Sequence, residues 1–337
     1  MPRQIPRRSL LAGLGLGLVG AGALTGCSGG SGSSGSASGS ASGASGSAPG
    51  SVSATPTRSV QTATGTVEVP SAPRRVVVLD TAELDSVLTL GFTPVGASRA
   101  AADSSLPDYW GSARLEGIAS TGVIGDPDLD AITRLDPDLI LSSRTRDGSR
   151  YESLSAIAPT VLTETTGYPW KENFRTHADA LNQQASVDLV STAYAQHVSQ
   201  VIQSLGGTDG AKKQQISLVR FVQDEKPRLY ATQNFLGVVL ADLHLGRPAA
   251  QSGAVFDTTL TDPAQLGGLD GTAIFHSTYG DAAKADTSSV VGSKAWQALA
   301  AVTAHRAFSV DDELWFQGIG YTGANLVLSQ LQRFLRT

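Results

Sequence analysis

The sequence predicts an α/β protein of two lobes, each built on a mainly parallel sheet flanked by helices, with one long bridging helix between them. Three observations lead to this prediction. Short β-branched runs alternate with segments of helical periodicity, as they do in parallel sheets. The same order of strands and helices occurs in the first and the second half of the chain. Between the halves, residues 182–205 form one uninterrupted amphipathic segment.

The first lobe is predicted over residues 67–181. Its units are a strand at 75–79, a helix at 82–90 that stops at Gly91, a helix at 129–135 and a strand at 139–141. The strands are runs of β-branched and other apolar residues, whereas the helices have apolar residues at intervals of three and four. The turn Asp136-Pro137-Asp138 separates the second helix from its strand.

The second lobe is predicted over residues 207–337. Its units are strands at 218–222 and 228–230, a helix at 235–245 closed by Gly246, and a turn and strand at 269–275. A shift of 134 residues lays residues 128–143 over 262–277, with Ile140 on Ile274. This internal repeat indicates two lobes of similar plan.

A single helix is predicted to join the lobes, over residues 182–206. Its apolar residues recur at intervals of three and four and are Val187, Val190, Tyr194, Val198, Val201 and Leu205. About 20 helical residues span roughly 30 Å, the width of a small domain. Such a helix limits hinge motion and leaves a cleft at the strand ends, where open α/β sheets bind their ligands.

Residues 1–26 have the pattern of an export signal, because three arginines precede an uncharged apolar stretch at 10–24. At about 15 residues this stretch is short for a membrane span, which needs roughly 20. The segment Leu24-Thr25-Gly26-Cys27 resembles the lipobox of bacterial lipoproteins, and RRSLL at 7–11 resembles a twin-arginine export signal. The resemblance implies cleavage before Cys27, the only cysteine of the chain, and its acylation.

Residues 27–66 are predicted to be the lipidated cysteine and a flexible tether. The tether consists mostly of Ser, Gly, Ala and Thr, with too few large apolar side chains to offset the entropy of ordering. Roughly 35 such residues reach about 30 Å on average. We therefore expect an exported protein that is held by its lipid on the outer face of the cell membrane.

The charge balance excludes one class of partner. Without the three arginines of the export signal, 22 basic residues remain against 30 acidic ones, which argues against nucleic acid. The predicted lobes contain no cysteine, which suits an exported protein whose core is large enough to need no disulfide. No second apolar run has the length of a membrane span.

Several segments of the two lobes occur in a set order. They are LILSSRTR at 139–146, YESLSAIAPTV at 151–161, WKENF at 170–174, VRF at 219–221, LGRP at 245–248, WQALAAV at 296–302 and LWFQGIG at 314–320. In this order they resemble the iron-siderophore substrate-binding lipoproteins of ABC importers, which are periplasmic binding proteins with one rigid helix between their lobes. The resemblance covers about residues 67–335 and implies a receptor that delivers a ferric siderophore to a membrane permease.

A ferric siderophore brings its iron already wrapped in oxygen ligands, so a receptor needs hydrogen-bond donors and apolar walls. Arginine forks and aromatic rings supply these. The predicted ligand contacts are Arg146, Trp170, Arg220 and Trp315, with Tyr230 and Phe235 as second choices. The resemblance implies that both tryptophans, which we expect in loops, face the cleft. The alternatives are a salt bridge within one lobe for each arginine and core packing for the aromatic residues.

The resemblance also implies docking on the permease through one acidic residue on each lobe. Asp130 occupies the first of these positions, where the family usually has Glu. The shift of 134 residues places Ala264 opposite it, so the second acid is missing there and the nearby Asp262 is the candidate substitute.

The sequence lacks the motifs of catalysis and of direct metal binding. The five histidines, which lie far apart and form no H-E-x-x-H motif, are His177, His197, His244, His276 and His305. Neither a P-loop nor an S-x-x-K motif occurs, and the predicted lobes contain no G-x-S-x-G elbow. We therefore expect no enzyme activity, no cofactor and no metal bound directly by the protein.

The expected ligand is a ferric siderophore, and the acidic mature chain favours a near-neutral hydroxamate type over strongly anionic ferric catecholates. Haem, cobalamin or ferric citrate in the same fold are the close alternatives. A lipid-anchored envelope enzyme and a purely structural tether are the rivals from other classes. The expected partners are the siderophore and an ABC permease, for a monomeric protein attached to the membrane by its lipid.

Overall fold

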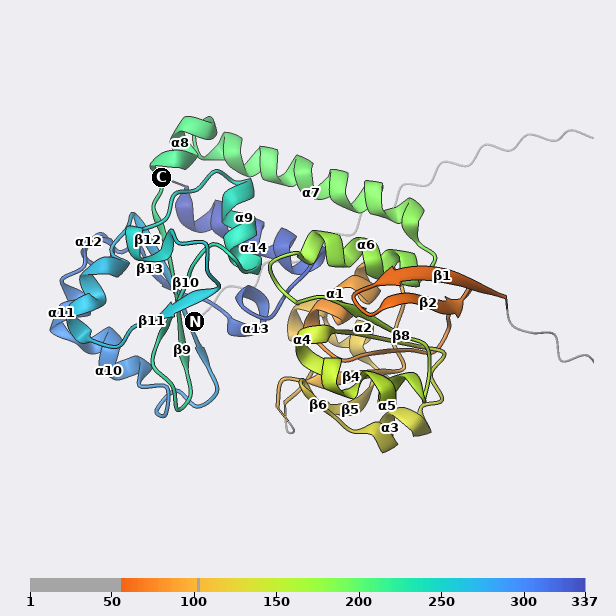
Figure 1. The fold of residues 1–337 in the computed structure, drawn as a ribbon. Coiled ribbons are helices and arrows are strands. Elements are labelled where there is room, and N and C mark those ends of the chain that lie inside the picture. The colour runs from red at the N-terminus through yellow and green to blue at the C-terminus, as the bar shows by residue number, and fades with distance from the viewer. Residues whose placement is uncertain (1–55, 102–103, 337) are drawn as a thin grey trace, which may run out of the picture. The chain divides into compact units, whose positions relative to one another are not determined.

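The computed structural model describes residues 56–101 and 104–336 (Figure 1). The described residues all belong to one compact unit, Ser53–Thr337. The predicted export signal, Cys27 and most of the predicted tether lie outside the described residues. This compact unit contains two large sheets with flanking helices, which confirms the predicted α/β class.

The N-terminal lobe is built on a six-stranded sheet in the order β6-β5-β4-β3-β7-β8. Its strands are β3 (Val76–Val78), β4 (Gly96–Arg99), β5 (Ala119–Val123), β6 (Asp126–Pro127), β7 (Leu139–Ser143) and β8 (Thr160–Thr163). All neighbouring strands are parallel except β5 and β6. The central strands β3 and β7 are buried along their whole length, which explains the unbroken apolar runs in their sequences.

The helices and helical turns of this lobe are short. They are α1 (Thr81–Thr89), η1 (Asp108–Trp110), α2 (Ser112–Leu115), α3 (Leu129–Arg134), α4 (Arg144–Asp147), η2 (Gly148–Arg150), α5 (Tyr151–Ser155) and α6 (Trp170–Ala180). Asp80 caps α1, because its carboxylate accepts a hydrogen bond from the backbone N–H of Thr81. The chain leaves α1 through Gly91 at a φ of 88°, in agreement with the predicted stop.

A β-hairpin before the six-stranded sheet corrects the predicted end of the tether. Strands β1 (Thr57–Thr62) and β2 (Gly65–Pro70) pair in antiparallel fashion, although we expected flexible chain as far as residue 66. Val60 and Val69 are buried in the core of the N-terminal lobe. The many Ser, Thr and Gly residues concealed the alternation of valines that gives this hairpin a buried face.

The C-terminal lobe contains a five-stranded sheet in the order β11-β10-β9-β12-β13. Its strands are β9 (Ile216–Val222), β10 (Arg228–Tyr230), β11 (Asp257–Thr259), β12 (Ala273–Tyr279) and β13 (Ala307–Ser309). Strands β9, β12 and β13 are parallel, but β10 and β11 are antiparallel, so this sheet is mixed rather than mainly parallel. The connection from β9 to β10 is too short for a crossover helix, and only an antiparallel pair can form.

The helical segments of this lobe follow the repeat only in part. They are α8 (Gly207–Lys213), α9 (Phe235–Asp242), η3 (Ala249–Gln251), η4 (Pro263–Leu269), α10 (Thr287–Gly292), α11 (Lys294–Gln297), α12 (Ala300–Thr303) and α13 (Asp312–Trp315). Strand β12 begins at Ala273, the residue that the shift of 134 places on the first residue of β7. The counterpart of α3 is the 3₁₀ segment η4 rather than an α-helix.

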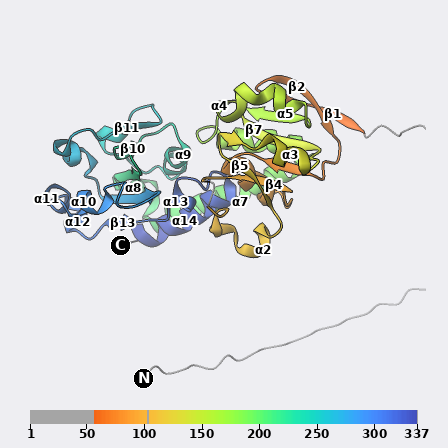
Figure 2. The same ribbon diagram turned by 90° about the horizontal axis from the view of Figure 1, so that it is seen from below.

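Four helices form the joint between the lobes. Helix α7 (Gln184–Ser204) confirms the predicted long helix, and α14 (Tyr321–Leu335) packs along it (Figures 1 and 2). Helix α6 packs on α7, and α1 packs on both α6 and α14. None of the described helices is long and apolar enough to cross a membrane.

The carboxylate of Asp85 fastens this joint. It lies on α1 and accepts hydrogen bonds from the backbone N–H groups of Thr322 at 3.2 Å and Gly323 at 3.0 Å, at the start of α14. Gly320 permits this approach, because a Cβ atom there would lie 2.1 Å from Asp85 Oδ1. The last helix of the chain is therefore capped by a side chain of the first lobe.

Candidate ligand-binding site

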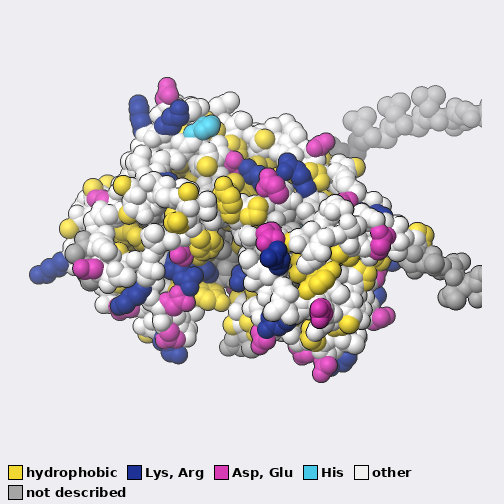
Figure 3. Space-filling model, viewed as in Figure 1, with side chains coloured by type: hydrophobic (Ala, Val, Ile, Leu, Met, Phe, Trp, Pro, Cys, Tyr) yellow, Lys and Arg dark blue, Asp and Glu magenta, His cyan; other side chains and the backbone are white. Residues whose placement is uncertain are grey.

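A cavity of about 580 Å³ lies between the lobes, at the carboxyl ends of the strands of the N-terminal sheet. That lobe contributes residues that directly follow strands: Asp80 and Thr81 after β3, Ala100 after β4, Ile124 after β5, Thr145 and Arg146 after β7, and Thr165, Thr166 and Gly167 after β8. The C-terminal lobe contributes Arg220, Arg228, Tyr230, Phe256, Tyr279, Phe316, Gln317 and Ile319. Figure 3 shows the hollow between the lobes, with basic, acidic and hydrophobic side chains around it.

Arg146 lines the cavity from α4, and most of its hydrogen-bonding capacity is available. Its Nε donates to Oδ2 of Asp80 at 2.7 Å, and this neighbouring carboxylate raises the pKa of the guanidinium. No hydrogen bond joins its two Nη groups to another described residue, so four of its five N–H groups can serve a ligand. The Arg146 side chain is 41% exposed, whereas that of Asp80 is 2% exposed.

Arg220 lines the same cavity from β9, but its guanidinium is engaged on most sides. Nε and Nη2 donate to the two oxygens of Asp312 at 2.8 and 2.5 Å, and Nη1 donates to the hydroxyl of Tyr230 at 3.2 Å. The ring centroids of Tyr279 and Phe316 lie 4.6 and 5.5 Å from the guanidinium carbon. Burial alone would lower the pKa of Arg220, but the hydrogen bonds to Asp312 raise it on balance.

Asp312 holds this arginine from the first turn of α13. Besides the two bonds from Arg220, it accepts one from the Ser277 hydroxyl at 2.7 Å and one from the Gln317 amide at 2.9 Å. The side chains of Arg220 and Asp312 are only 12% and 9% exposed. The salt bridge within one lobe that we considered as an alternative is therefore present, and Arg220 is the member of the pair that lines this cavity.

Arg228 is a third guanidinium of the cavity, and the sequence analysis did not single it out. It lies directly opposite Arg220 in the antiparallel pair of β9 and β10, so the two side chains share one face of the sheet. Its Nε donates to Glu225 at 2.9 Å, and its Nη1 lies 3.9 Å from Asp257. Two adjacent arginines are tolerated here because each has its own carboxylate partner.

Four aromatic rings form the apolar walls. Tyr230, predicted as a second choice, lines the cavity and lies 5.2 Å from Phe256 and 4.7 Å from Phe316, measured between ring centroids. The side chain of Phe256 is 47% exposed. The Tyr279 hydroxyl donates to the carbonyl of Ala100 at 3.3 Å, which joins the two lobes beside the cavity.

The structure buries Trp170 and Phe235 where α9 meets the joint, which corrects their prediction as ligand contacts and matches the alternative of core packing. Trp170 is the first residue of α6 rather than a loop residue, and it is buried. Its ring meets Tyr194 of α7, Phe235 of α9 and Tyr321 of α14 edge to face, at centroid distances of 4.8 to 5.6 Å. This packing of rings from four helices explains the burial.

Trp315 also lies in a core rather than in the cavity. It ends helix α13, stacks on Phe275 at 4.7 Å, and donates its indole N–H to Gln330 of α14 at 2.7 Å. The next residue, Phe316, lines the cavity in its place. One position along the chain turns the side chain to the other side, so Phe316 and not the predicted Trp315 lines the cavity.

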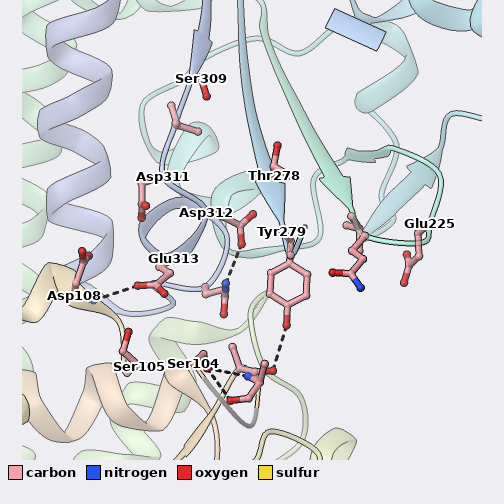
Figure 4. A pocket seen from close by; sticks show the side chains of 17 residues that line it. Ser104, Ser105, Asp108, Glu225, Thr278, Tyr279, Ser309, Asp311, Asp312 and Glu313 are labelled. Atoms are coloured by element: carbon pink, nitrogen blue, oxygen red, sulfur yellow. Dashed lines mark hydrogen bonds between the residues drawn. The ribbon is translucent and has the colours of Figure 1, made fainter. Parts of the chain in front are cut away.

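A second cavity, of about 860 Å³, adjoins the first and shares Ala100, Tyr279 and Gln317 with it (Figure 4). Its acidic lining residues are Asp108, Glu225, Asp311, Asp312 and Glu313, and none of the described residues that line it is basic. Burial raises the pKa of Glu313, whose carboxylate accepts a hydrogen bond from the backbone N–H of Asp108 across the lobes. Arginines thus line the first cavity, whereas the charged residues that line the second are all acidic.

A buried acid lies behind Arg146. Burial, with the nearby charge of Asp80, raises the pKa of Glu83 to about 8, and neither of its oxygens has a hydrogen-bond partner among the described residues. Its Oε1 is 3.6 Å from Nε2 of His177, whose pKa burial lowers to about 3. Ser86 gives its only proton to the Ala82 carbonyl, so His177 donates Nδ1–H to Ser86 and leaves an acceptor facing Glu83. The raised pKa of Glu83 favours the protonated acid beside this acceptor.

The comparisons with known proteins agree with the two-lobed geometry. A family model described as periplasmic binding protein matches residues 76–314, which is more than half of the chain. The chain belongs to the periplasmic binding protein family. This is a family of substrate-binding proteins rather than of enzymes.

Individual relatives of this periplasmic binding protein have names that mention iron carriers. The probable siderophore-binding lipoprotein YfiY of Bacillus subtilis is 32% identical over 293 residues, covering 83% of this chain and 89% of the relative. The Fe(3+) dicitrate-binding periplasmic protein FecB of Escherichia coli is 29% identical over 204 residues, covering 58% and 64%. The crystal structure of Staphylococcus aureus SirA complexed with staphyloferrin B superposes with a TM-score of 0.74 at 27% identity, covering 82% and 98%.

The remaining predicted residues lie outside the cavity. Asp130 is exposed on the first turn of α3, and Asp262 is exposed before η4, while Cys27 lies outside the described residues. Arg144, two residues before Arg146, is 55% exposed and pairs with Glu164. Within residues 56–101 and 104–336, no three His, Cys, Asp or Glu side chains are grouped so that they could hold a metal ion.

Sequence signals existed for some of the lining residues that were not among the predicted contacts. Asp80 directly follows the strand predicted at 75–79, where the strand-end rule would have placed it in the cleft. The shift of 134 residues lays Thr145 on Tyr279, and both line the cavity. Period two in the strand at 228–230 puts Arg228 on the face of Tyr230. Phe256 had no such signal, because it lies in an irregular segment before β11.

Proposed function

We propose that this periplasmic binding protein captures a ferric siderophore in the cavity between its lobes and delivers it to an ABC permease for iron uptake. One observation carries the proposal: guanidinium donors from both lobes and aromatic rings line the same cavity. Iron-bound oxygens accept hydrogen bonds from arginine forks, and the organic frame of the carrier packs on rings. Because the iron arrives inside its chelate, the protein needs no metal ligands of its own.

The names of the relatives support this ligand class. YfiY is named as siderophore-binding, and the SirA structure contains staphyloferrin B. We retain the hydroxamate type as the preferred ligand. Ferric citrate is the second candidate, because FecB is named as a ferric dicitrate-binding protein.

The proposal includes the attachment and docking inferred from sequence. Acyl chains on Cys27 would hold the protein at the outer face of the cell membrane after export by the twin-arginine route. Asp130 and Asp262 would meet basic groups of the permease, and both residues are exposed. The protein would act as a monomer, without catalysis and without a cofactor.

Titration of intrinsic tryptophan fluorescence tests the proposal. The full-length protein, solubilised in detergent, is titrated with ferric and iron-free forms of a hydroxamate siderophore, with ferric citrate, haem and cobalamin. We expect saturable quenching by a ferric complex with a dissociation constant of about 1 μM or below, and at least about tenfold weaker binding of the iron-free form. Binding of haem, cobalamin or bare metal ions in preference to every ferric chelate would overturn the proposal.

A further inference from the structure

Each arginine of the cavity is already paired with a carboxylate of the protein. Arg146 pairs with Asp80 at 2.7 Å, Arg220 pairs with both oxygens of Asp312, and Arg228 pairs with Glu225 and approaches Asp257. Three guanidinium groups therefore face four carboxylates within direct ion-pair distance. The adjoining cavity adds acidic residues and no basic one among its described lining residues.

This pairing removes charge from the cavity without removing hydrogen-bond donors. Coulomb energies fall with distance, so an anion beside a guanidinium is attracted by it and repelled by its carboxylate a few ångströms farther away. The attraction that remains is that of a dipole rather than of a full charge. The Nη groups of Arg146 nevertheless keep their N–H donors, which bind neutral and anionic oxygens alike.

The charge of a ferric siderophore depends on its chelating groups. Three hydroxamates neutralise iron(III), whereas three catecholates leave a trianionic complex, and citrate complexes are also anionic. A trianion needs uncompensated positive groups to offset its loss of hydration on entering a cleft. A neutral complex needs only hydrogen-bond donors and apolar walls, which this cavity supplies.

We propose that Asp80 and Asp312 are specificity-determining residues, which neutralise the cleft arginines and thereby restrict the cavity to ferric complexes of low net charge. This inference rests on the proposed function. It assigns the choice of ligand to the carboxylates behind the arginines rather than to the arginines themselves. Asp80 is the more adjustable of the two, because its partner Arg146 is half-exposed and holds only one hydrogen bond to it.

The test compares Asp80→Asn with the parent protein in binding two iron(III) complexes. One is a neutral trihydroxamate complex and the other is a trianionic tris-catecholate complex. Asparagine keeps the cap on α1, since its amide oxygen can still accept from the Thr81 N–H. We expect the parent to prefer the neutral complex by about a hundredfold, and Asp80→Asn to bind the trianionic complex about tenfold more tightly than the parent. Affinity for the neutral complex should change much less than affinity for the trianionic one.

Two controls separate charge from structure. Asp179→Asn removes the carboxylate of an ion pair with Arg58 that lies outside the cavity, and it should leave both affinities unchanged. The gain of Asp80→Asn on the trianionic complex should shrink as salt is raised, whereas binding of the neutral complex should not respond. Asp312→Asn, if its thermal melt shows a folded protein, should repeat the gain.

The possible failures are distinct. Tighter binding of the trianionic complex than of the neutral one by the parent would overturn this inference and leave the proposed function standing. An equal change of both affinities in Asp80→Asn, or no change in either, would also overturn it. If the parent binds no ferric complex at all, the proposed function falls and this inference falls with it.

Discussion

The two lobes present the same residue type to the cavity in two different states. Arg146 of the N-terminal lobe is 41% exposed and donates one hydrogen bond, to Asp80. Arg220 of the C-terminal lobe is 12% exposed, makes three hydrogen bonds and lies near two aromatic rings. Lining a cavity is therefore not the same as being available to a ligand.

The difference follows from where each arginine lies in its sheet. Arg146 comes after the end of β7, beyond the last strand pairing, where water can reach its fork. Arg220 lies within β9, where neighbouring strands surround its stem and only a buried partner makes its charge tolerable. We expect substitutions of the two arginines to separate ligand affinity from stability.

The largest effect is expected for Arg220→Ala, on stability. The substitution leaves Asp312 buried without its cationic partner, which should cost about 3–5 kcal/mol in the free energy of unfolding. Equilibrium denaturation in urea measures this loss. Arg144→Ala is the matched control, since its ion pair with Glu164 is exposed and should contribute less than about 1 kcal/mol. Equal stability of the two variants would mean that the buried pair of Arg220 and Asp312 contributes no more than an exposed ion pair.

Arg146→Ala should show the opposite balance. Loss of its free N–H donors should weaken binding of the preferred ferric complex about tenfold to a hundredfold, because hydrogen bonds from charged groups contribute about 1.5–3 kcal/mol. Its free energy of unfolding should fall by less than that of Arg220→Ala. Fluorescence titration and urea denaturation of one preparation give both quantities. Unchanged affinity would show that Arg146 does not contact the ligand.

The smallest effect concerns the pH dependence of stability in the N-terminal lobe. Glu83 has its pKa raised by burial to about 8, from an ordinary value of 4.5. Between these values the unfolded chain ionises this side chain while the native protein keeps it protonated, so its contribution to stability is complete below about pH 4.5 and is lost as pH rises toward 8.

Glu83→Gln should remove that dependence and flatten the stability profile between about pH 5 and 8, because glutamine is neutral throughout and can donate to His177. Thermal melts across this range provide the measurement. Glu152→Gln, at an exposed position of α5, is the control and should follow the parent. A parallel profile for Glu83→Gln and the parent would mean that Glu83 is ionised in the native protein.

The architecture could be predicted from the sequence because the spacing of apolar residues reflects which side of each helix or strand is buried. The runs of β3 and β7, the spacing in α7 and the stop at Gly91 each reflect one local rule. The strand-end rule then placed Arg146 and would have placed Asp80. These features depend on residues that are neighbours in the chain.

The charge state of the cavity could not be predicted in the same way, because it depends on pairs that are distant in sequence. Arg220 and Asp312 lie 92 residues apart, and Arg146 and Asp80 lie 66 apart. Nor does one sequence show which side of a helix meets which neighbour. Trp170 was expected in a loop that faces the cleft, but it begins a helix and rings from three other helices enclose it.

The rings around Trp170 have a consequence for the size of the cargo. Aromatic rings that interlock edge to face cannot slide past one another without opening gaps, so their packing resists a change in the angle between the lobes. The spacing of the lobes is then largely set before a ligand arrives. A carrier that is too bulky is excluded sterically, and one that is too small touches only one lobe. The fixed spacing of the lobes would select the ligand by its diameter, while the charged groups in the cavity select it by its charge.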